Sequence, residues 1–426
     1  MPGAPRGGPV LYLVGALAGC VVGLVGGSFR WCLERADALR GSLLDASQEL
    51  GVAGRLVPVA LAAVGAAVAC AIARRVPAAA GSGIQDVEAV WHGEREPARL
   101  LPLLPAKFVG GVIAMGSGLL LGREGPTVHM GAAIGTEAGR RTRMSARDVT
   151  LLHTSLAGAG LAVAFTAPLG GVVFVLEEVT RTVRARLVLL TLIGTATAVG
   201  CAQLILGDRP VFAMPDPAAP PLSLLPVFLL LGAATGVLGV GYSRLVVGAL
   251  AYCDGVTRVG PVARAAVIGA VVGLLLGIDP SLGGGGEQLS GLLVDGEVPV
   301  VTVLAGYLVV RFVAGPLSYA AGAPGGLFAP LLALGALWGA LVQGLAAPVL
   351  PGGTGAASFA AVGMAALFAA VVRAPLTGVV LVVEMTGATS LLVPLLAACF
   401  AATLTADRLG SVPVYDTLRL RMTRSS

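Results

Sequence analysis

Residues 122–126 read Gly-Arg-Glu-Gly-Pro and separate two apolar segments. The preceding segment, Phe108–Leu121, is nearly free of charge, and the following one, Thr127–Ala138, is mostly apolar or small. A carboxylate at membrane depth is costly unless it faces a partner or a water-filled path. The position of Glu124 therefore predicts a gate or a proton carrier in an ion pathway.

The composition of the whole chain indicates a protein that crosses a lipid bilayer many times. Of its 426 residues, 56% are hydrophobic and 12% are charged, whereas a soluble domain has roughly 25% charged residues. Long apolar tracts recur from Val10 to Leu409. Since a spanning helix needs about 20 apolar residues, we expect an all-α polytopic membrane protein with ten or more segments that cross or enter the bilayer.

Charge and reactive residues exclude several other classes of protein. We assign the net charge of +5 to basic loops and tails, and we expect no nucleic-acid partner. The six cysteines have no CxxC spacing, and the three histidines form no HExxH motif. We therefore expect no metal, no cofactor and no enzymatic activity. One catalytic alternative is an intramembrane hydrolase that pairs Ser82 or Ser155 with His153.

An internal repeat divides the chain into two halves. Ala167–Glu177 aligns with Ala374–Glu384 at an offset of 207 residues, and Pro126, Gly131, Ala132 and Gly135 align with Pro330, Gly335, Ala336 and Gly339 at an offset of 204. We expect a first membrane repeat over residues 1–206, a Pro-rich linker over 207–221, a second repeat with a C-terminal helix over 222–426, and no soluble domain.

Short segments interrupted by Gly and Pro favour an inverted arrangement of the two halves. Residues 127–138 and 170–179 are too short to span alone, which is typical of transporters with broken helices and a site between the repeats. Arginine clusters lie at 140–147, 181–186 and 408–424. The positive-inside rule places them, and the C-terminus, in the cytoplasm.

Four short motifs place small or flexible residues at the start of an apolar helix. They are Gly81–Ile84, Gly122–Pro126, Gly326–Pro330 and Pro413–Tyr415. A helix N-terminus offers free N–H groups and about half a positive charge. Several such ends converging at mid-membrane predict a site for a dehydrated anion, to which Ser82 and Tyr415 can add hydroxyl donors.

With these motifs in this order, the sequence resembles the CLC family of chloride channels and proton-coupled chloride transporters. The resemblance covers nearly the whole chain, through the strings GSGI, GREGP and GGLFAP and the tyrosine near the C-terminus. It implies two inverted repeats, and a homodimer with one pathway per subunit. It also implies the compact prokaryotic type without regulatory domains, in the plasma (inner) membrane.

The resemblance also implies a role for each site residue. The central anion is held by Ser82 with Gly83 and Ile84, by the backbone N–H groups of Leu327 and Phe328, and by Tyr415. Glu124 matches the family's gate and external proton site. Glu178 matches the internal proton site of the transporter branch, whereas Glu177 and Glu384 are expected to be structural.

The expected function is therefore the exchange of chloride for protons. The alternatives are a passive chloride channel of the same fold, which Glu178 disfavours, and an exchanger for nitrate or fluoride. Gln85 departs from the proline that commonly follows GSGI, which affects the expected selectivity and not the fold. Lys107 is expected at an entrance vestibule or with its amine at the lipid head groups.

Overall fold

Helices form most of the chain in the computed structural model, which describes residues 8–49, 51–208, 211–212, 214, 220–350 and 355–425. The helices up to the middle of the chain are α1 (Gly8–Gln48), α2 (Gly51–Gly54), α3 (Leu56–Arg75), α4 (Ile84–Trp91), α5 (Leu100–Gly116), α6 (Glu124–Arg141), α7 (Ala146–Phe165), α8 (Pro168–Phe174) and α9 (Ala185–Leu206). Those that follow are α10 (Leu225–Gly255), α11 (Pro261–Ile278), α12 (Glu287–Asp295), α13 (Val301–Ala320), α14 (Phe328–Ala346), α15 (Ala356–Val372), α16 (Pro375–Thr386), α17 (Leu392–Arg408) and α18 (Val414–Ser425).

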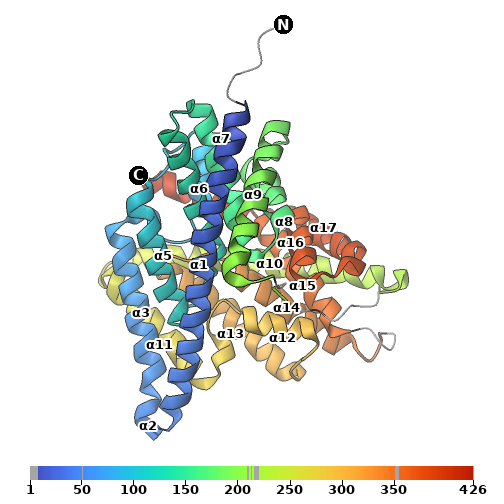
Figure 1. The fold of residues 1–426 in the computed structure, drawn as a ribbon. Coiled ribbons are helices and arrows are strands. Elements are labelled where there is room, and N and C mark those ends of the chain that lie inside the picture. The colour runs from blue at the N-terminus through green and yellow to red at the C-terminus, as the bar shows by residue number, and fades with distance from the viewer. Residues whose placement is uncertain are drawn as a thin grey trace.

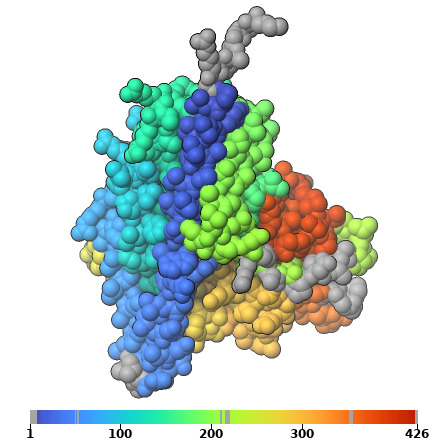
Figure 2. Space-filling model, viewed as in Figure 1, coloured from blue at the N-terminus to red at the C-terminus, as the bar shows by residue number. Residues whose placement is uncertain are grey.

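Many of these helices can cross a bilayer. Within the described ranges, nine helices are long and apolar enough to span a membrane, and α5, α15 and α16 are shorter apolar helices. The prediction of an all-α polytopic fold is confirmed. Side by side with α9, α1 runs most of the height of the molecule (Figures 1 and 2).

The first helix is longer than its apolar tract. Its apolar part ends near Phe29, but α1 continues to Gln48. In the added turns Arg30 bonds to Glu34 at 3.0 Å and Arg40 to Asp37 at 2.6 Å. Pairs spaced by three or four residues lie on one face of a helix and stabilise it without apolar burial, so this helix continues beyond its apolar tract.

Both halves use the same close helix pairing, α6 with α7 and α14 with α15. A Cβ added at Gly131 would lie 2.3 Å from the Leu156 carbonyl oxygen, and one at Gly335 would lie 2.4 Å from the Gly363 carbonyl oxygen. The glycines that reveal the repeat in the sequence are therefore those that let the backbones of each pair touch.

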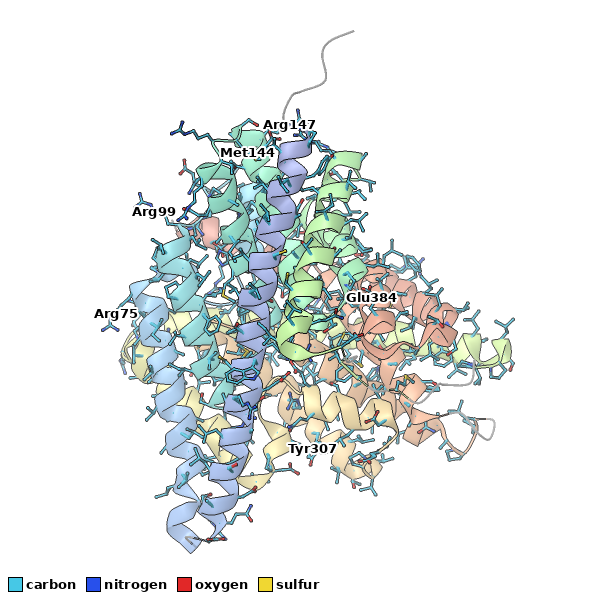
Figure 3. All side chains as sticks on the ribbon, viewed as in Figure 1. Arg75, Arg99, Met144, Arg147, Tyr307 and Glu384 are labelled. Atoms are coloured by element: carbon cyan, nitrogen blue, oxygen red, sulfur yellow. The ribbon has the colours of Figure 1, made fainter. Side chains whose placement is uncertain are left out.

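Two repeat-related glutamates show that the halves are inverted. The carboxylate of Glu177, after α8, accepts hydrogen bonds from the N–H groups of Leu376 (3.0 Å) and Thr377 (2.7 Å) at the start of α16. In return, Glu384 in α16 accepts from Leu169 (3.0 Å) and Gly170 (2.7 Å) at the start of α8. Because each glutamate caps the start of the other helix, α8 and α16 must run antiparallel to each other. Figure 3 labels Glu384 of α16.

Two buried cations repeat the symmetry. Lys107 on α5 donates to the carbonyl oxygens of Gly81 (2.9 Å) and Ala80 (3.4 Å). Arg311, 204 residues later on α13, donates to those of Gly284 (2.9 Å), Gly283 (3.0 Å) and Ser281 (2.8 Å). Each cation therefore holds the glycine-rich loop that leads into the next short helix, α4 or α12.

The domain limits stay predictions. Residues 209, 210, 213 and 215–219 of the expected linker lie outside the described residues. On either side of it, α9 ends at Leu206, and a single 3₁₀ turn, Leu222–Leu224, leads into α10.

Candidate functional site: a buried anion-binding centre

Backbone hydrogen bonds tie three of the four motifs together. Gly122 and Gly326 exchange two N–H to carbonyl bonds of 2.8 and 2.7 Å. Gly81 donates to the Ala323 carbonyl oxygen at 3.1 Å and accepts from Gly325 N–H at 3.1 Å. The starts of α4, α6 and α14 therefore converge at the contact between the two halves, although about 200 residues separate the motifs of the first half from those of the second.

The helix ends at this point supply free N–H groups. The first backbone bond of α4 runs from Val87 N–H to the Gly83 carbonyl oxygen, and that of α14 runs from Leu331 N–H to the Leu327 carbonyl oxygen. The N–H groups before these positions, including those of Ile84 and Phe328, have no partner within their helices. Buried N–H groups of this kind create a positive potential without a full charge.

Two hydroxyl groups lie in the same place. The side chains of Ser82 and Tyr415 are fully buried, and the two hydroxyls are neighbours. Neither oxygen has a hydrogen-bond partner within the described residues. A Cβ at Gly125 would lie 2.3 Å from Ser82 Oγ, so only glycine lets α6 approach this hydroxyl so closely. Leaving a buried hydroxyl unpaired costs about 1–3 kcal/mol, so the pair fits an acceptor that is not part of the protein.

Aromatic rings close one side of the centre. Phe328 packs its ring edge-on against Phe368 at 4.7 Å, Tyr415 at 5.6 Å and Phe174 at 5.9 Å between centroids. Phe328 and the neighbouring Leu327 are both fully buried. This apolar wall lowers the local dielectric, which strengthens the attraction between an anion and the surrounding dipoles.

Glu124 lies inside this centre. Its side chain is fully buried, and Oε2 accepts a hydrogen bond from Ala329 N–H at 3.3 Å at the start of α14. Oε1 has no partner within the described residues. The carboxylate therefore occupies a position where helix dipoles favour negative charge.

Glu178 lies in the π-helical turn Val175–Val179 that continues α8. It is 2% exposed, and so is Glu88 of α4, which is its neighbour. The Glu88 carboxylate lies 3.9 Å from Arg419 of α18. Arg419 also bonds to Asp416 (3.1 Å) and Glu94 (2.6 Å), so a charged network separates the two buried acids from the molecular surface.

Sequence reasoning missed some polar residues of the site and misplaced another. Tyr319 of α13 accepts a hydrogen bond from Ser82 N–H at 3.4 Å, and no pattern in the sequence distinguishes it from an ordinary membrane tyrosine. Glu88 follows GSGI at helical spacing, a signal that could have been used. The expected place of Lys107 at a vestibule or head group is wrong, because the side chain is fully buried against two carbonyl oxygens.

Residues proposed for a hydrolase are engaged elsewhere. Ser155 Oγ accepts a hydrogen bond from Thr191 at 3.1 Å, and His153 Nδ1 pairs with Thr136 Oγ1 at 2.8 Å. Ser82 faces Gly125 and Tyr415. The geometry does not arrange either serine with His153 as a nucleophile and base.

Comparison with known proteins identifies the family. Residues 64–407 match the family model described as voltage gated chloride channel. The chain belongs to the voltage-gated chloride channel (CLC) family. Among curated CLC relatives, the H(+)/Cl(-) exchange transporter ClcA of Vibrio parahaemolyticus serotype O3:K6 is 38% identical over 430 residues, which cover 96% of this chain and 89% of the relative. ClcA of Vibrio cholerae serotype O1 is 39% identical over 427 residues, covering 96% and 88%.

Solved CLC structures have the same fold. A slow cyanobacterial Cl−/H+ antiporter superimposes with a TM-score of 0.93 at 28% identity, covering 99% of both chains. A eukaryotic CLC transporter superimposes with a TM-score of 0.82 at 24% identity, covering 96% of this chain and 73% of the other. The prediction of a CLC-like fold is confirmed.

Proposed function

We propose that this chain is an antiporter that exchanges chloride for protons across a membrane. The observation that carries the proposal is the pair of buried, unpartnered hydroxyls of Ser82 and Tyr415 beside the helix end where the Glu124 carboxylate is held. The relatives named as H(+)/Cl(-) exchange transporters support the same function.

In this proposal the anion and the Glu124 carboxylate compete for the same dipoles. Ser82, Tyr415 and the backbone N–H groups of Ile84, Leu327 and Phe328 hold a dehydrated chloride, and Gly83 shapes the loop before α4. When Glu124 is deprotonated, its carboxylate occupies the outer part of the pathway. Protonation removes the charge that the dipoles stabilise, so the side chain leaves and chloride takes its place.

Protons from the opposite side reach Glu124 through Glu178. Glu178 is buried beside Glu88, within the network of Arg419, Asp416 and Glu94. Since two neighbouring buried carboxylates do not readily ionise together, one of them tends to keep a proton that it can pass on. The distance from there to Glu124 is bridged in part by water.

The experiment that tests the function records chloride and pH together in proteoliposomes. An outward chloride gradient should drive protons inward against their own gradient when a potassium ionophore clamps the membrane potential. Chloride efflux without uphill proton uptake would show the passive channel instead, and the exchanger proposal would then be abandoned.

The identity of the anion is a separate part of the proposal. Ser82 and the complete GREGP motif favour chloride over nitrate and fluoride as the exchanged ion. Proton uptake driven by equal gradients of the three anions should be largest with chloride. Larger uptake with nitrate or fluoride would assign the exchanger to that anion, and Gln85 would be the first residue to test.

We further propose that the C-terminus is cytoplasmic in a prokaryotic plasma membrane. Ion pairs join the arginine-rich segments at one end of the molecule, namely Arg186–Asp148 (2.8 Å) and Arg181–Asp416 (2.7 Å). Arg147 lies at this end and Tyr307 lies at the other in Figure 3. The positive-inside rule then makes the Arg147 end cytoplasmic, which accessibility of a cysteine added after Arg424 would test.

The CLC resemblance also leads us to propose a homodimer with one pathway per subunit. Two repeat-related leucines, Leu169 of α8 and Leu376 of α16, are half exposed. Each lies in the first turn of its helix, which the glutamate of the other helix caps. They would lie in a symmetric apolar interface. Light scattering in detergent should give about twice the chain mass of 42.3 kDa, and a single chain mass would exclude the dimer.

A further inference from the structure

An ion pair beside the gate joins the two halves of the chain. Arg123, the residue before Glu124, donates from its guanidinium to Glu287 Oε2 at 2.8 Å and from Nε to the Ala164 carbonyl oxygen at 3.1 Å. The Arg123 side chain is 4% exposed, whereas that of Glu287 is 39% exposed. The pair therefore has one buried member next to the gate and one member in contact with water.

Glu287 faces a vestibule at the Tyr307 end of the molecule. The vestibule is a cavity of about 310 Å³ that is lined by Asp37, Arg123, Glu287 and the loop 283–286. A second cavity of about 10 Å³ shares Arg123 and Glu287 with it and is also lined by Ala329. That volume is at the lower limit for one water molecule, and Ala329 is the residue whose N–H holds the gate carboxylate.

Glu287 occupies the position in the second half that Ile84, the residue after the anion-binding loop, occupies in the first half. Gly83 ends the first loop with φ +89° before α4, and Gly286 ends the second with φ +92° before α12. Lys107 holds the first loop and Arg311 holds the second. Where the first helix begins with the apolar Ile84, the second begins with a carboxylate.

We propose that Glu287 sets the external acidity at which the Glu124 gate opens. The ionised Glu287 carboxylate compensates the charge of Arg123, which weakens the attraction between Arg123 and the deprotonated Glu124. Without the charge of Glu287, the Arg123 guanidinium would hold the Glu124 carboxylate more firmly, and more acid would be needed to release it. Glu287 is thus a positioning residue that acts through Arg123. This inference rests on the proposed role of Glu124 as the gate.

Other charged groups near the pair come from two elements around it, α1 and α13. They are Arg30, Glu34, Asp37 and Arg40 from α1, and Arg311 from α13. Each of the two α1 acids is already paired with an arginine of its own helix. Glu287 is the acid that bonds to the residue preceding the gate, and this distinction gives a matched control.

The test measures isotopic chloride exchange in proteoliposomes at symmetric pH from 4 to 8. Replacement of Glu287 by Gln should shift the pH of half-maximal exchange about 0.5–1 unit toward acid, with the full rate recovered at low pH. Glu287→Asp, which keeps the charge, should restore most of the wild-type profile. Asp37→Asn removes a charge from the same vestibule and should leave the midpoint within about 0.2 units.

A double variant distinguishes the proposed role of Glu287 from the proposed role of Glu124 as the gate. In a Glu124→Gln background, exchange should no longer follow the gate's titration, and adding Glu287→Gln should change nothing. A wild-type profile that does not rise with acid would contradict the proposed gate itself. With that rise present, an unshifted Glu287→Gln midpoint, or an equal shift in Asp37→Asn, would overturn the role of Glu287 alone. Loss of exchange at every pH in both Glu287 variants, with wild-type elution on gel filtration, would overturn it as well.

Discussion

The two repeats share several backbone contacts and differ in chemistry at other equivalent positions. Gly122 and Gly326 are repeat-related and bond to each other, and the caps Glu177 and Glu384 bond to each other's helix. Residues that preserve the symmetry are therefore structural. A residue that serves only the fold is expected to recur in both halves. Positions where the two halves carry different residues therefore indicate function.

The differences gather along the pathway that we propose. Glu124 of α6 corresponds to Phe328 of α14, so one half supplies the acid and the other supplies the apolar wall. Glu178 corresponds to Met385, which leaves a single proton site of this kind. The comparison predicts that substitution of an unmatched residue changes transport, whereas substitution of a matched residue changes stability.

The largest effect is expected at the unmatched Glu178. Replacement by Gln removes the titrating group with little change in volume, so proton transport should fall about 100-fold or more while chloride flux stays within about twofold. Glu177→Gln is the matched control, since it makes the same change one residue earlier. Coupling that survives in Glu178→Gln, or is lost equally in Glu177→Gln, would contradict the assignment.

The matched cations test stability. Lys107→Met and Arg311→Met each leave buried carbonyl oxygens without donors, and we expect the thermal unfolding midpoint in detergent to fall by about 5–10 °C. The loss should be greater for Arg311, which holds three carbonyl oxygens where Lys107 holds two. Midpoints equal to that of the wild type would mean that these loops do not need their cations.

The matched caps should have smaller effects, and the effect at Glu177 should be the larger of the two because it also accepts a hydrogen bond from Thr377 Oγ1 at 2.7 Å. Glu177→Gln and Glu384→Gln keep an oxygen acceptor but remove the charge that favours a helix N-terminus, so each should lower the thermal midpoint by about 2–4 °C. A thermal midpoint that falls more in Glu384→Gln than in Glu177→Gln, or that does not fall in either variant, would contradict this assignment of the caps.

The smallest effect is expected at Ser82. Ser82→Ala removes one of several donors to the anion, so chloride affinity measured by titration calorimetry should fall about 10-fold. Ser155→Ala serves as the control, since this buried hydroxyl is bonded to Thr191 away from the site. An unchanged affinity in Ser82→Ala would remove the hydroxyl from the anion site.

Much of this division between repeat-matched and unmatched residues could be predicted from the sequence. Composition predicted the membrane fold, and the spacing of Pro and Gly predicted the repeat, because close helix contacts leave few alternatives to glycine. The motifs gave the residues that converge on Ser82. What the sequence hid were partners from distant segments: the ion pair of Arg123 with Glu287, the burial of Lys107, and the proximity of Glu88 to Glu178.

The end of α1 shows a second limit. A hydropathy pattern indicates the apolar turns of α1 up to Phe29, but it gives no signal for the ion-paired turns that follow. Tyr319 shows a third, because its contact with Ser82 N–H depends on where α13 ends in space. In each case the missing information is the identity of a neighbour, which local sequence does not contain.

The central claim is that one movable acid competes with chloride for the same helix dipoles. It is tested most directly by proton uptake into proteoliposomes of Glu124→Gln under an outward chloride gradient, with chloride efflux recorded in the same sample. We predict that chloride efflux persists and that no protons enter against their gradient. Proton uptake driven by the chloride gradient in this variant would contradict the account.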